Sequence, residues 1–558
     1  MCGIFLYFSQ QQPQRPLAQL MPAFMQTTHR GPDSSVLRRL GPGLVMGFHR
    51  LAIHNLSRSG DQPFEQDGVF SVCNGEIYNH LDLRDEITTT TTTNNSCDCA
   101  VLLPLYAGAA VLHDMVRRLD GDFAFCIADT KTQKIHLGRD PVGVKPLFYA
   151  TTEQGELIVS SEMKSILPLL KQPIKVAVSM LAPGTTLTFD MNTFKSQIDT
   201  YWDADRFFSF PSLAAAAKSD DNIVIKAAIR WQLIKAVEKR LSSDRPVGLF
   251  ISGGLDSSLI AGIATRVLGQ RGLPSFAIGM PGSPDVQNAQ IVADFLGTQH
   301  HTVTFDVEGE GLAVVEEVIR HLETYDMTTI RASVPQFLLA QYVARHTDVK
   351  VVLSGEGSDE LFGGYMYSHL APSNDALQAD SARLVRELQY FDVLRTDRTT
   401  AAHGLEVRVP FLDRNFIQLV ASLPASYKNP SSSSGRPPRI EKAVLREAFA
   451  PGAGKPANAI IPDEILHRTK NAFSDACGYS WIPTLQAHCE TLVSDEDFAR
   501  RFQLFPHLPP PTKEAFYYRA TFERLFPGQH TIVPHYWLPQ WVPNNERGEP
   551  SAKLLQLM

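Results

Sequence analysis

The sequence is short of basic charge, of cysteine and of long hydrophobic runs. Its 59 Asp and Glu outnumber its 52 Lys and Arg, and the net charge of −7 argues against nucleic-acid binding, because the usual footprint of such a protein is a basic stripe. Seven cysteines, an odd number in 558 residues, fit a reducing compartment better than a disulfide framework. No apolar run is long enough to span a bilayer, so no membrane partner is expected.

The first residues, MCGIFLYFSQQQPQ, do not have the pattern of a secretory signal peptide. Their apolar run is short, no cationic segment precedes it, and polar residues follow at once. Together with the reducing environment that the cysteine content indicates, this predicts a cytoplasmic location.

The spacing of apolar residues divides the chain into two halves with different expected folds. Residues 1–205 predict a layered α+β domain of short strands with a helix at 100–119, and residues 206–222, which carry a run of alanines, are the expected linker. In residues 223–558 strands and helices alternate, which is typical of a doubly wound parallel α/β sheet, and a helical extension follows. The strands expected are residues 2–8, 43–53, 68–73, 122–128, 134–137, 157–160, 247–251, 275–278, 301–305 and 349–353. The helices expected in the second half are residues 223–241, 257–268, 286–296, 311–322 and 335–345.

A glycine-rich loop, SGGLDSS at 252–258, follows an apolar strand candidate and opens a helix candidate. Gly253 and Gly254 allow a tight turn close to a ligand, and a helix N-terminus offers free N–H groups to an anion. Further polar groups for phosphates, including a carboxylate that suits Mg²⁺, are on Ser252, Ser257, Ser258 and Asp256. The Gly-Lys-Ser/Thr of a Walker loop is missing, so an ordinary γ-phosphoryl site is not expected. A glycine turn with serine caps is the alternative interpretation.

A second loop, SGEGSDE at 354–360, also follows an apolar strand candidate. In a parallel sheet both loops lie at the carboxyl ends of strands, where ligands bind. Glu356, Asp359 and Glu360 place three carboxylates beside a phosphate site, and because these repel ATP we expect Mg²⁺ between them. An acidic helix cap is the alternative.

A cysteine follows the initiator methionine. Removal of Met1, which a small second residue normally allows, leaves Cys2 with a free α-amine, whose pKa of about 8 suits it to act as the base for its own thiol. For this position taken alone, a buried strand cysteine is the alternative.

Several blocks carry a resemblance to known families. SGGLDSS resembles the pyrophosphate loop of the ATP pyrophosphatases, which cleave ATP between the α- and β-phosphates and adenylate a substrate. HLETYDMTTIRAS at 321–333, SGEGSDE and AAHGLEVRVPFLD at 401–413 closely resemble the glutamine-dependent asparagine synthetases, known as asparagine synthetase B. That resemblance covers nearly the whole chain. It implies synthesis of asparagine from aspartate, ATP and glutamine-derived ammonia through β-aspartyl-AMP, which yields glutamate, AMP and pyrophosphate.

The resemblance also implies roles for residues of the second half. Pyrophosphate and adenosine would be bound by Phe250, Ser252, Gly253, Gly254, Asp256, Ser257, Ser258, Ile278, Ser354, Gly355 and Lys442. Aspartate or its adenylate would be held by Thr328, Arg331 and Asp359, and Mg²⁺ by Asp256 and Asp359. Glu356 would position or deprotonate ammonia. Glu406 and Arg408 are expected to form a structural ion pair.

Four blocks of the first half resemble the N-terminal-nucleophile glutamine amidotransferases, a four-layer αββα fold: MCGI at 1–4, HRGPD at 29–33, FHRLA at 48–52 and NGEIYNH at 74–80. By this likeness Cys2 is the nucleophile, and the Asn74 amide and the Gly75 N–H form the oxyanion hole. Arg50 would pair with the α-carboxylate of glutamine. The other glutamine contacts would be Ile53, Glu76 and Asp98, the two carboxylates receiving the α-ammonium group.

Two departures from the family pattern stand out. Asn55 replaces a frequent aspartate, and Asp98 lies between two cysteines after a threonine run. No CxxC pair or histidine cluster supports a metal there. A structural role is therefore expected for Cys73, Cys97, Cys99, Cys126, Cys477 and Cys489.

Other functions remain open beside asparagine synthesis. A related ATP-pyrophosphatase amidotransferase would act on a different carboxylate, and a β-lactam synthetase should lack Cys2 and Arg50, which are both present. An ammonia-only synthetase would keep the second half, and a non-catalytic binding protein would be expected to have lost Cys2, Asp256 or Glu356. A homodimer is compatible with the resemblance. An internal ammonia passage between the two sites is a hypothesis that rests on their presence in one chain.

Overall fold

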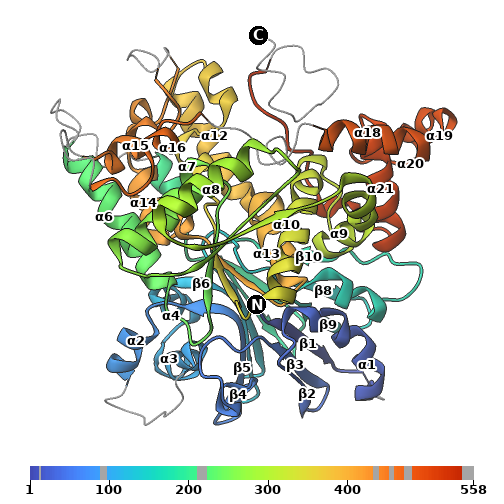
Figure 1. Cartoon of the computed structure of the whole chain (residues 1–558). Helices are drawn as coiled ribbons and strands as arrows, with labels where there is room; N and C mark the ends of the chain where they lie inside the picture. Colours follow the sequence, from blue (N-terminus) through green and yellow to red (C-terminus); the bar gives the residue numbers. More distant parts are fainter. Residues whose placement is uncertain are drawn as a thin grey trace.

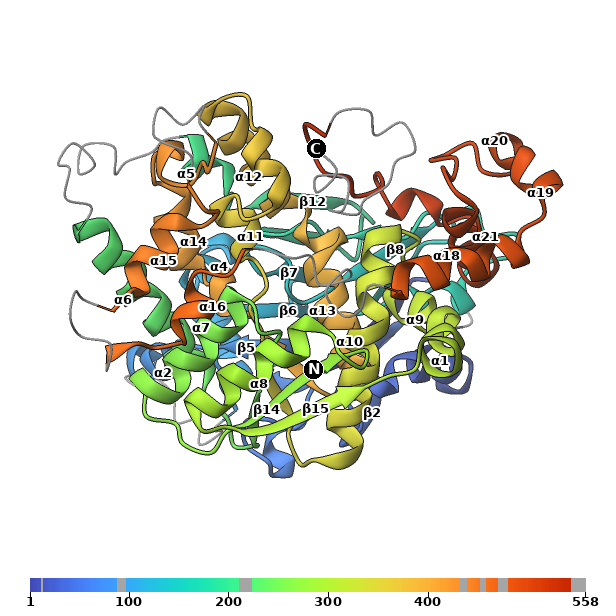
Figure 2. The same ribbon diagram turned by 45° about the horizontal axis from the view of Figure 1, so that its top comes forward.

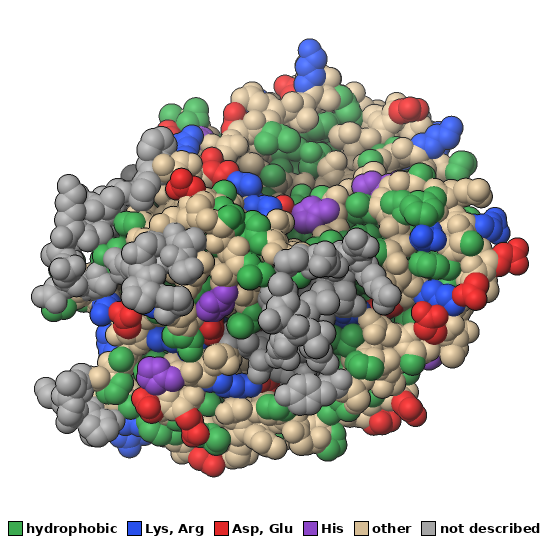
Figure 3. Space-filling view, turned by 90° about the horizontal axis from the view of Figure 1, so that it is seen from above, with side chains coloured by type: hydrophobic (Ala, Val, Ile, Leu, Met, Phe, Trp, Pro, Cys, Tyr) green, Lys and Arg blue, Asp and Glu red, His purple; other side chains and the backbone are tan. Residues whose placement is uncertain are grey.

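The computed structural model describes residues 1–11, 14–87, 97–209, 223–431, 439–451, 458–469 and 480–542. Two six-stranded antiparallel sheets form the first half and one five-stranded parallel sheet the second. Figure 1 shows the first half, blue to cyan, below the second half, green to red. None of the helices in these ranges combines the length and the apolar character needed to cross a bilayer. On the face seen in Figure 3, acidic and basic side chains are interspersed.

The first sheet has the order β10-β8-β9-β1-β3-β2 and the second the order β12-β11-β7-β6-β5-β4. Side chains alternate along β1, so Ile4, Leu6 and Phe8 pack between the two sheets while Phe5 and Tyr7 face the opposite side. The strands are β1 Gly3–Ser9, β2 Ser34–Gly41, β3 Leu44–Arg50, β4 Phe64–Gln66, β5 Val69–Ile77, β6 Gly121–Asp129, β7 Lys134–Arg139, β8 Phe148–Thr152, β9 Glu156–Ser160, β10 Ser179–Met180, β11 Thr185–Asp190 and β12 Ser196–Thr200.

Helices cover the outer faces of both sheets, which completes the expected αββα layers. α1 (Leu17–Phe24) packs on the first sheet, and α2 (His80–Ile87), α3 (Leu102–Gly108) and α4 (Leu112–Arg118) pack on the second. The single helix expected at 100–119 is wrong. The chain is extended at Ala109 and Val111, directly after Gly108, because this break lets the apolar faces of both short helices reach the sheet.

The sheet of the second half has the order β15-β14-β13-β16-β17, and all its strand pairs are parallel. The strands are β13 Val247–Phe250, β14 Pro274–Gly279, β15 Gln299–Thr304, β16 Val351–Leu353 and β17 Glu406–Arg408. Helices on both faces include α6 Ile223–Arg240, α7 Leu255–Gly262, α8 Pro284–Leu296, α9 Val315–Leu322 and α10 Met327–His346. β13 and β16 are neighbours, so the loops that follow them meet at one edge of the sheet. The fold class expected for each half is confirmed.

Local signals explain several helix boundaries. α8 begins with proline and ends at Gly297, which adopts the left-handed conformation (φ 67°) that glycine tolerates. α10 begins after Asp326, whose carboxylate accepts the backbone N–H of Thr329 at 2.9 Å. The sequence placed the start of α10 eight residues late, at Pro335, which lies inside the helix.

The remaining helices form the extension after the parallel sheet. They are α11 Ser358–Phe362, α12 Asn374–Glu387, α13 Asp392–Ala401, α14 Arg414–Ala421, α15 Ala443–Phe449, α16 Asp463–Leu466, α18 Trp481–Leu492, α19 Asp495–Ala499, α20 Arg501–Leu504 and α21 Lys513–Leu525. Figures 1 and 2 show α18 to α21 (red) together at one end of the second half, where α21 packs on α9. Residues 205–209 form α5, at the start of the expected linker. Residues 210–222, the threonine run and Cys477 lie outside the described residues.

Buried charges join the two halves. Arg30 is fully buried and pairs with Glu162 at 2.7 Å and with Asp397 of α13 at 3.0 Å. Arg398, also on α13, pairs with Glu162 at 2.9 Å. Met1 is fully buried at this junction. Because a buried charge is costly to leave unpaired, this network favours one fixed arrangement of the halves.

Candidate active sites

Cys2 lies at the start of β1, at the junction of the two halves. Its backbone N–H donates to Asn74 Oδ1 at 2.8 Å, and its Sγ lies 3.4 Å from the Leu51 N–H donor and 3.7 Å from the Leu51 carbonyl. Burial raises the pKa of the Cys2 thiol to about 11. With Met1 attached, the Cys2 nitrogen is an amide and the thiol stays protonated at neutral pH, so the chain in this form lacks both the base and the thiolate.

An unpartnered donor lies next to Cys2. Asn74 Nδ2 is buried and has no hydrogen-bond partner within the part of the chain that the structure describes. The next residue, Gly75, has φ 135°, and a Cβ there would lie 2.0 Å from the Asp122 carbonyl oxygen. Glycine is therefore required at this position of β5. The oxyanion hole of the Asn74 amide and the Gly75 N–H stays a prediction, and the unpartnered Asn74 Nδ2 beside Cys2 is compatible with it.

Arg50 is buried at the end of β3 and is already engaged. Its guanidinium donates to the Ser57 carbonyl and to Asp61 at 2.8 Å each, and also to the carbonyls of His54 and Asn55. Arg50 therefore holds the loop 54–61 in place, and the loop in turn fixes the guanidinium. Arg50 could bind the glutamine α-carboxylate, as predicted, through the N–H groups that are not used in these contacts.

Glu76 and Asp98, the expected ligands of the glutamine α-ammonium group, are both buried. Glu76 contacts His54 at 3.0 Å and Arg408 of β17 at 3.2 Å, so it joins the two halves. Burial opposes the charge of His54, but Glu76 outweighs it and raises the pKa of His54 to about 9. Asp98 accepts the Ile77 N–H at 2.8 Å. His54 was not predicted, because nothing in the sequence pairs it with Glu76.

Ile53, the remaining glutamine contact expected, is buried and belongs to the largest hydrophobic core. Its carbonyl accepts the Asp244 N–H at 3.0 Å, and the Asp244 carboxylate accepts the Asn55 N–H at 2.8 Å. Asn55 adopts φ 55°, a conformation that asparagine tolerates better than most residues.

The cysteines that the structure describes outside position 2 are buried and form no disulfide. They are Cys73, Cys97, Cys99, Cys126 and Cys489, and their structural role stays a prediction. Among the residues that the structure describes, no group of three or more His, Cys, Asp or Glu side chains is arranged to hold a metal ion.

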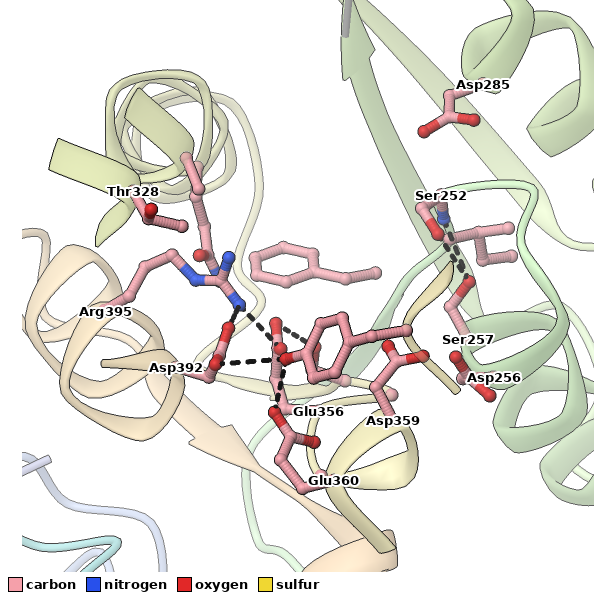
Figure 4. Close-up of a pocket in the computed structure, with 18 of the residues that line it drawn as sticks. Ser252, Asp256, Ser257, Asp285, Thr328, Glu356, Asp359, Glu360, Asp392 and Arg395 are labelled. Atoms are coloured by element: carbon pink, nitrogen blue, oxygen red, sulfur yellow. Dashed lines mark hydrogen bonds and ion pairs between the residues drawn. The ribbon is translucent and has the colours of Figure 1, made fainter. Parts of the chain in front are cut away.

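A cavity opens where the loops after β13 and β16 meet. The predicted residues that line it are Phe250, Ser252, Asp256, Ser257, Ile278, Thr328, Ser354, Gly355, Glu356 and Asp359. Figure 4 shows Ser252, Asp256, Ser257 and Asp285 on one side, Thr328, Asp392 and Arg395 on the other, and the acidic loop between. A Cβ on Gly355 would lie 2.7 Å from the Ser257 backbone nitrogen, so only glycine lets the two loops touch.

The glycine-rich loop is held by its own side chains and by Arg468. Ser257 Oγ accepts the Ser252 N–H at 3.0 Å, and Ser258 Oγ donates to the Gly254 carbonyl at 2.6 Å. Gly253 has φ 68°, and its carbonyl accepts from Arg468 at 2.8 Å. Ser258 therefore lies inside α7 with its hydroxyl bonded back to the carbonyl four residues earlier, and it is not among the residues that line the cavity.

Lys442 lies between the two carboxylates that the sequence expects to hold Mg²⁺. Its Nζ is 2.6 Å from Asp256 and 2.7 Å from Asp359, and its side chain is 1% exposed. A Cβ on Gly364 would lie 2.0 Å from Lys442 Cε, so the lysine fits only beside glycine. Lys442 is a buried cation of the site.

A smaller second cavity adjoins the first at the glycine-rich loop. It is lined by Gly254, Asp256 and Asp285 and by three basic residues, Lys442, Arg446 and Arg468. The sequence analysis missed Arg446 and Arg468, because neither belongs to a block with a recognised role. Each of the three is paired with a carboxylate, Lys442 with Asp256, Arg446 with Glu441 and Arg468 with Asp285. The cavity therefore offers cationic N–H donors beside a loop that suits phosphates, rather than an excess of positive charge.

Glu356 faces an arginine that the sequence analysis also missed. Arg395 of α13 contacts Glu356 Oε2 at 2.7 Å and Asp392 at 2.8 Å, and all three line the cavity. Ser354 Oγ lies 3.5 Å from Glu356 Oε1. The catalytic carboxylate expected from the motif is therefore held by a cation from a different element.

Arg331 does not face the cavity. Its side chain is 1% exposed and forms a bidentate ion pair with Glu514 of α21, at 2.7 and 2.6 Å. Residues 328, 332, 336 and 339 line the cavity and follow one face of α10, whereas Arg331 points to the neighbouring helix. Of the aspartate ligands predicted on this helix, the structure brings only Thr328 to the cavity.

Comparison with known proteins identifies both halves. Residues 1–202 match the glutamine amidotransferase domain family, and residues 228–387 and 369–556 match the asparagine synthase family. Over 575 residues the chain is 39% identical to a glutamine-hydrolysing asparagine synthetase of Cricetulus griseus and to that of Homo sapiens, covering 100% of this chain and 98% of each relative. A probable asparagine synthetase of Acanthamoeba polyphaga mimivirus is 37% identical over the full length of both chains. The chain belongs to the glutamine-hydrolysing asparagine synthetases.

Membership of the asparagine synthetase family confirms the resemblance inferred from the sequence blocks. The structure brings the predicted residues together in two places, around Cys2 and around the loops after β13 and β16. Arg331 belongs to neither group. The roles of individual residues stay predictions and are developed below.

Proposed function

We propose that this chain makes asparagine from aspartate, ATP and glutamine, with glutamine hydrolysed at Cys2 and aspartate activated in the cavity at β13 and β16. One observation carries this conclusion. The same chain holds a cysteine beside an unpartnered, buried amide, Asn74 Nδ2, and two touching loops that suit a nucleotide. The family match supports both parts.

In the glutaminase half, removal of Met1 converts the Cys2 nitrogen into an amine. That nitrogen already lies 2.8 Å from Asn74 Oδ1, which orients its lone pair and protons. The amine takes the proton of the thiol, Sγ attacks the amide carbon of glutamine, and the oxyanion receives hydrogen bonds from Asn74 Nδ2 and the Gly75 N–H. Each such donor is worth about 3 kcal/mol in the barrier. The protonated amine gives its proton to the amide nitrogen, the C–N bond breaks and ammonia leaves. Water then hydrolyses the thioester to glutamate and restores the thiol.

In the synthase half, the β-carboxylate of aspartate attacks the α-phosphorus of ATP, and pyrophosphate leaves. Lys442, Arg446 and Arg468 would stabilise the charge of the leaving group, and their position around the glycine-rich loop supports this role. Ammonia attacks the β-carbonyl carbon of the adenylate, AMP leaves, and Glu356 accepts the proton released. The ion pair with Arg395 fixes the orientation of Glu356.

Magnesium fits the carboxylates at the loop junction. Asp256 and Asp359 both contact the Lys442 amine, and Asp256 Oδ1 is buried with no partner in the described ranges. Mg²⁺ is usually bound by one or two protein carboxylates and takes its other ligands from phosphates and water, so these two carboxylates suit it. When bound there, the ion would neutralise phosphate charge. The positive charge of Lys442 would also neutralise part of the phosphate charge.

The two sites belong together because ammonium, the main form of ammonia at neutral pH, is not a nucleophile. We therefore also propose a protected passage for ammonia between the halves. Its support is the position of Cys2 at their junction, where Arg30 Nε donates to the Cys2 carbonyl at 2.9 Å and the same guanidinium reaches Asp397. Free labelled ammonia should not compete fully with glutamine nitrogen at saturating glutamine. A cytoplasmic location and a homodimer are further parts of the proposal.

Product analysis tests the whole proposal. The purified chain is incubated with aspartate, ATP, Mg²⁺ and glutamine, and the products are separated. Asparagine, glutamate, AMP and pyrophosphate are expected in equal amounts when the sites are coupled. ADP in place of AMP would exclude adenylation and redirect the second half to another reaction.

A further inference from the structure

One end of the cavity holds a buried carboxylate that has no ion-pair partner among the residues that the structure describes. Glu360 lines the cavity and is 2% exposed. Its Oε1 accepts the Tyr365 hydroxyl at 2.7 Å, while Oε2 is buried and has no hydrogen-bond partner in the described part of the chain. Burying a carboxylate oxygen without a hydrogen-bond donor costs free energy. The position of Glu360 Oε2 therefore indicates a ligand that supplies the missing donors.

A second carboxylate converges on the same place. The Tyr365 hydroxyl that bonds Glu360 also lies 3.5 Å from Asp392 Oδ2. Figure 4 shows Asp392 and Glu360 joined through this hydroxyl, on the side of the cavity away from Ser252 and Ser257. The two carboxylates therefore offer a negative pocket to a small cation with several N–H donors.

Arg395 lies beside this negative pocket and has one N–H donor that is not engaged by the described residues. Arg395 bonds Asp392 and Glu356 through the same terminal nitrogen, Nη2, at 2.8 and 2.7 Å. Its Nε is buried and has no hydrogen-bond partner in the ranges that the structure describes. A donor that suits a carboxylate and an acceptor that suits an ammonium group thus line the same end of one cavity.

The head group of an α-amino acid has this pair of charges. We propose that Glu360 and Asp392 bind the α-ammonium group of the acceptor substrate, and that Arg395 binds its α-carboxylate. The inference rests on the proposed function and deepens it, because it assigns the part of the site that selects an amino acid over a simple dicarboxylate. With the head group held here, the β-carboxylate of aspartate points to the loops that hold ATP.

This arrangement predicts how the enzyme discriminates between close analogues. Succinate is aspartate without the α-ammonium group, and β-alanine is aspartate without the α-carboxylate. Either one leaves a buried charge of the cavity without its partner, which a polar site rejects far more strongly than it rejects a change in size. Both analogues keep the carboxylate that reacts with ATP.

The first measurement uses the wild-type chain. Pyrophosphate release is followed with ATP, Mg²⁺ and saturating ammonia, and aspartate, succinate and β-alanine are compared as substrates and as inhibitors. We expect both analogues to be weaker than aspartate by about 10- to 100-fold or more in kcat/KM and in inhibition constant. Succinate that binds as tightly as aspartate would overturn the proposal without any variant.

The second measurement uses Glu360→Gln and Asp392→Asn, with Glu496→Gln on the exposed helix α19 as the matched control. The two cavity variants should raise the KM for aspartate about 10- to 100-fold and narrow the preference for aspartate over succinate, with the KM values for ATP and Mg²⁺ nearly unchanged. The control should behave as wild type. Glutamine hydrolysis, which uses the other half, reports whether each variant is folded.

The outcomes separate the alternatives. A rise in the KM for Mg²⁺ with an unchanged preference for aspartate would make Glu360 and Asp392 metal ligands and overturn the proposal. If a cavity variant does not fold, the wild-type comparison decides alone. A wild-type chain that makes no asparagine from aspartate contradicts the proposed function itself, whereas asparagine synthesis without discrimination against succinate contradicts only this subsite.

Discussion

Arg408 of β17 forms a buried ion pair with Glu76 of β5 at 3.2 Å, which ties the synthase sheet to the glutamine site. The same guanidinium bonds Glu406 at 2.9 Å, so the structural ion pair expected from the sequence is present and extends into the other half. The Arg408 carbonyl accepts the N–H of Ser354, at the start of the acidic loop. One residue therefore contacts both sites.

Replacing Arg408 with methionine should destabilise the protein, because Glu406 would lose its arginine partner and Glu76 would keep His54 but lose Arg408, both in a buried place. Breaking a buried pair in this way costs about 3–5 kcal/mol. The melting temperature should fall and the KM for glutamine should rise. Arg38→Met is the matched control, because Arg38 pairs with Glu65 on the surface and such pairs contribute little. Equal melting temperatures for the two variants would show that the buried pair does not stabilise the junction.

The Cys2→Ala variant should lose glutamine-dependent synthesis and keep ammonia-dependent synthesis, since only the thioester step is removed. The two activities are measured as asparagine formed with either nitrogen source. Retention of glutamine-dependent synthesis would show that Cys2 is not the nucleophile of glutamine hydrolysis. Loss of both activities in a folded variant would contradict the division between the halves.

The Asn74→Ala variant should lower the kcat of glutamine hydrolysis by about 100-fold or more, because it removes an oxyanion donor. The KM for glutamine should change much less, since the donor acts mainly on the transition state. Steady-state release of glutamate is the measurement. A variant with normal kcat would place the oxyanion elsewhere.

The Glu356→Ala variant should impair asparagine synthesis with either nitrogen source and spare glutamine hydrolysis. The carboxylate lies in the cavity of the second half and touches Arg395, far along the chain from the Cys2 site. Glutamate release and asparagine formation are assayed on one preparation. Parallel loss of both in a folded protein would argue against the role given to Glu356.

The His54–Glu76 pair should make stability depend on pH in a defined window. Glu76 raises the pKa of His54 to about 9, and burial raises the pKa of Glu76 to about 7, so both partners are charged mainly between pH about 7 and 9. Wild type should therefore be more stable than His54→Gln at pH about 8, and this difference should shrink towards pH about 10 as His54 loses its proton. Melting temperatures of both proteins across this range are the check. A difference that grows with pH would show that His54 is neutral in the folded chain.

Strands and helices with regular apolar patterns could be predicted from the sequence. α6 was placed within one residue, and the central strand β13 likewise. β17 was missed because a strand of three residues gives no periodic signal, and β2 was missed because its side chains are only partly buried. The break between α3 and α4 depends on how both helices meet the sheet, which sequence patterns do not encode.

The two sites could be predicted only where a motif carries the residues. Cys2, Asn74 and the two glycine-containing loops stand in such blocks. Arg395 and Arg468 do not, and they reach their sites through folding of distant elements. Arg331 stands inside a block and yet pairs with Glu514, a partner 183 residues away that no local pattern reveals.

Transfer of a heavy oxygen isotope tests the central claim most directly. Aspartate labelled in its β-carboxylate is incubated with the chain, ATP, Mg²⁺ and glutamine, and AMP and pyrophosphate are analysed by mass spectrometry. Adenylation predicts one labelled oxygen in the phosphate of AMP and none in pyrophosphate. Unlabelled AMP, or label in any other phosphate product, would contradict it.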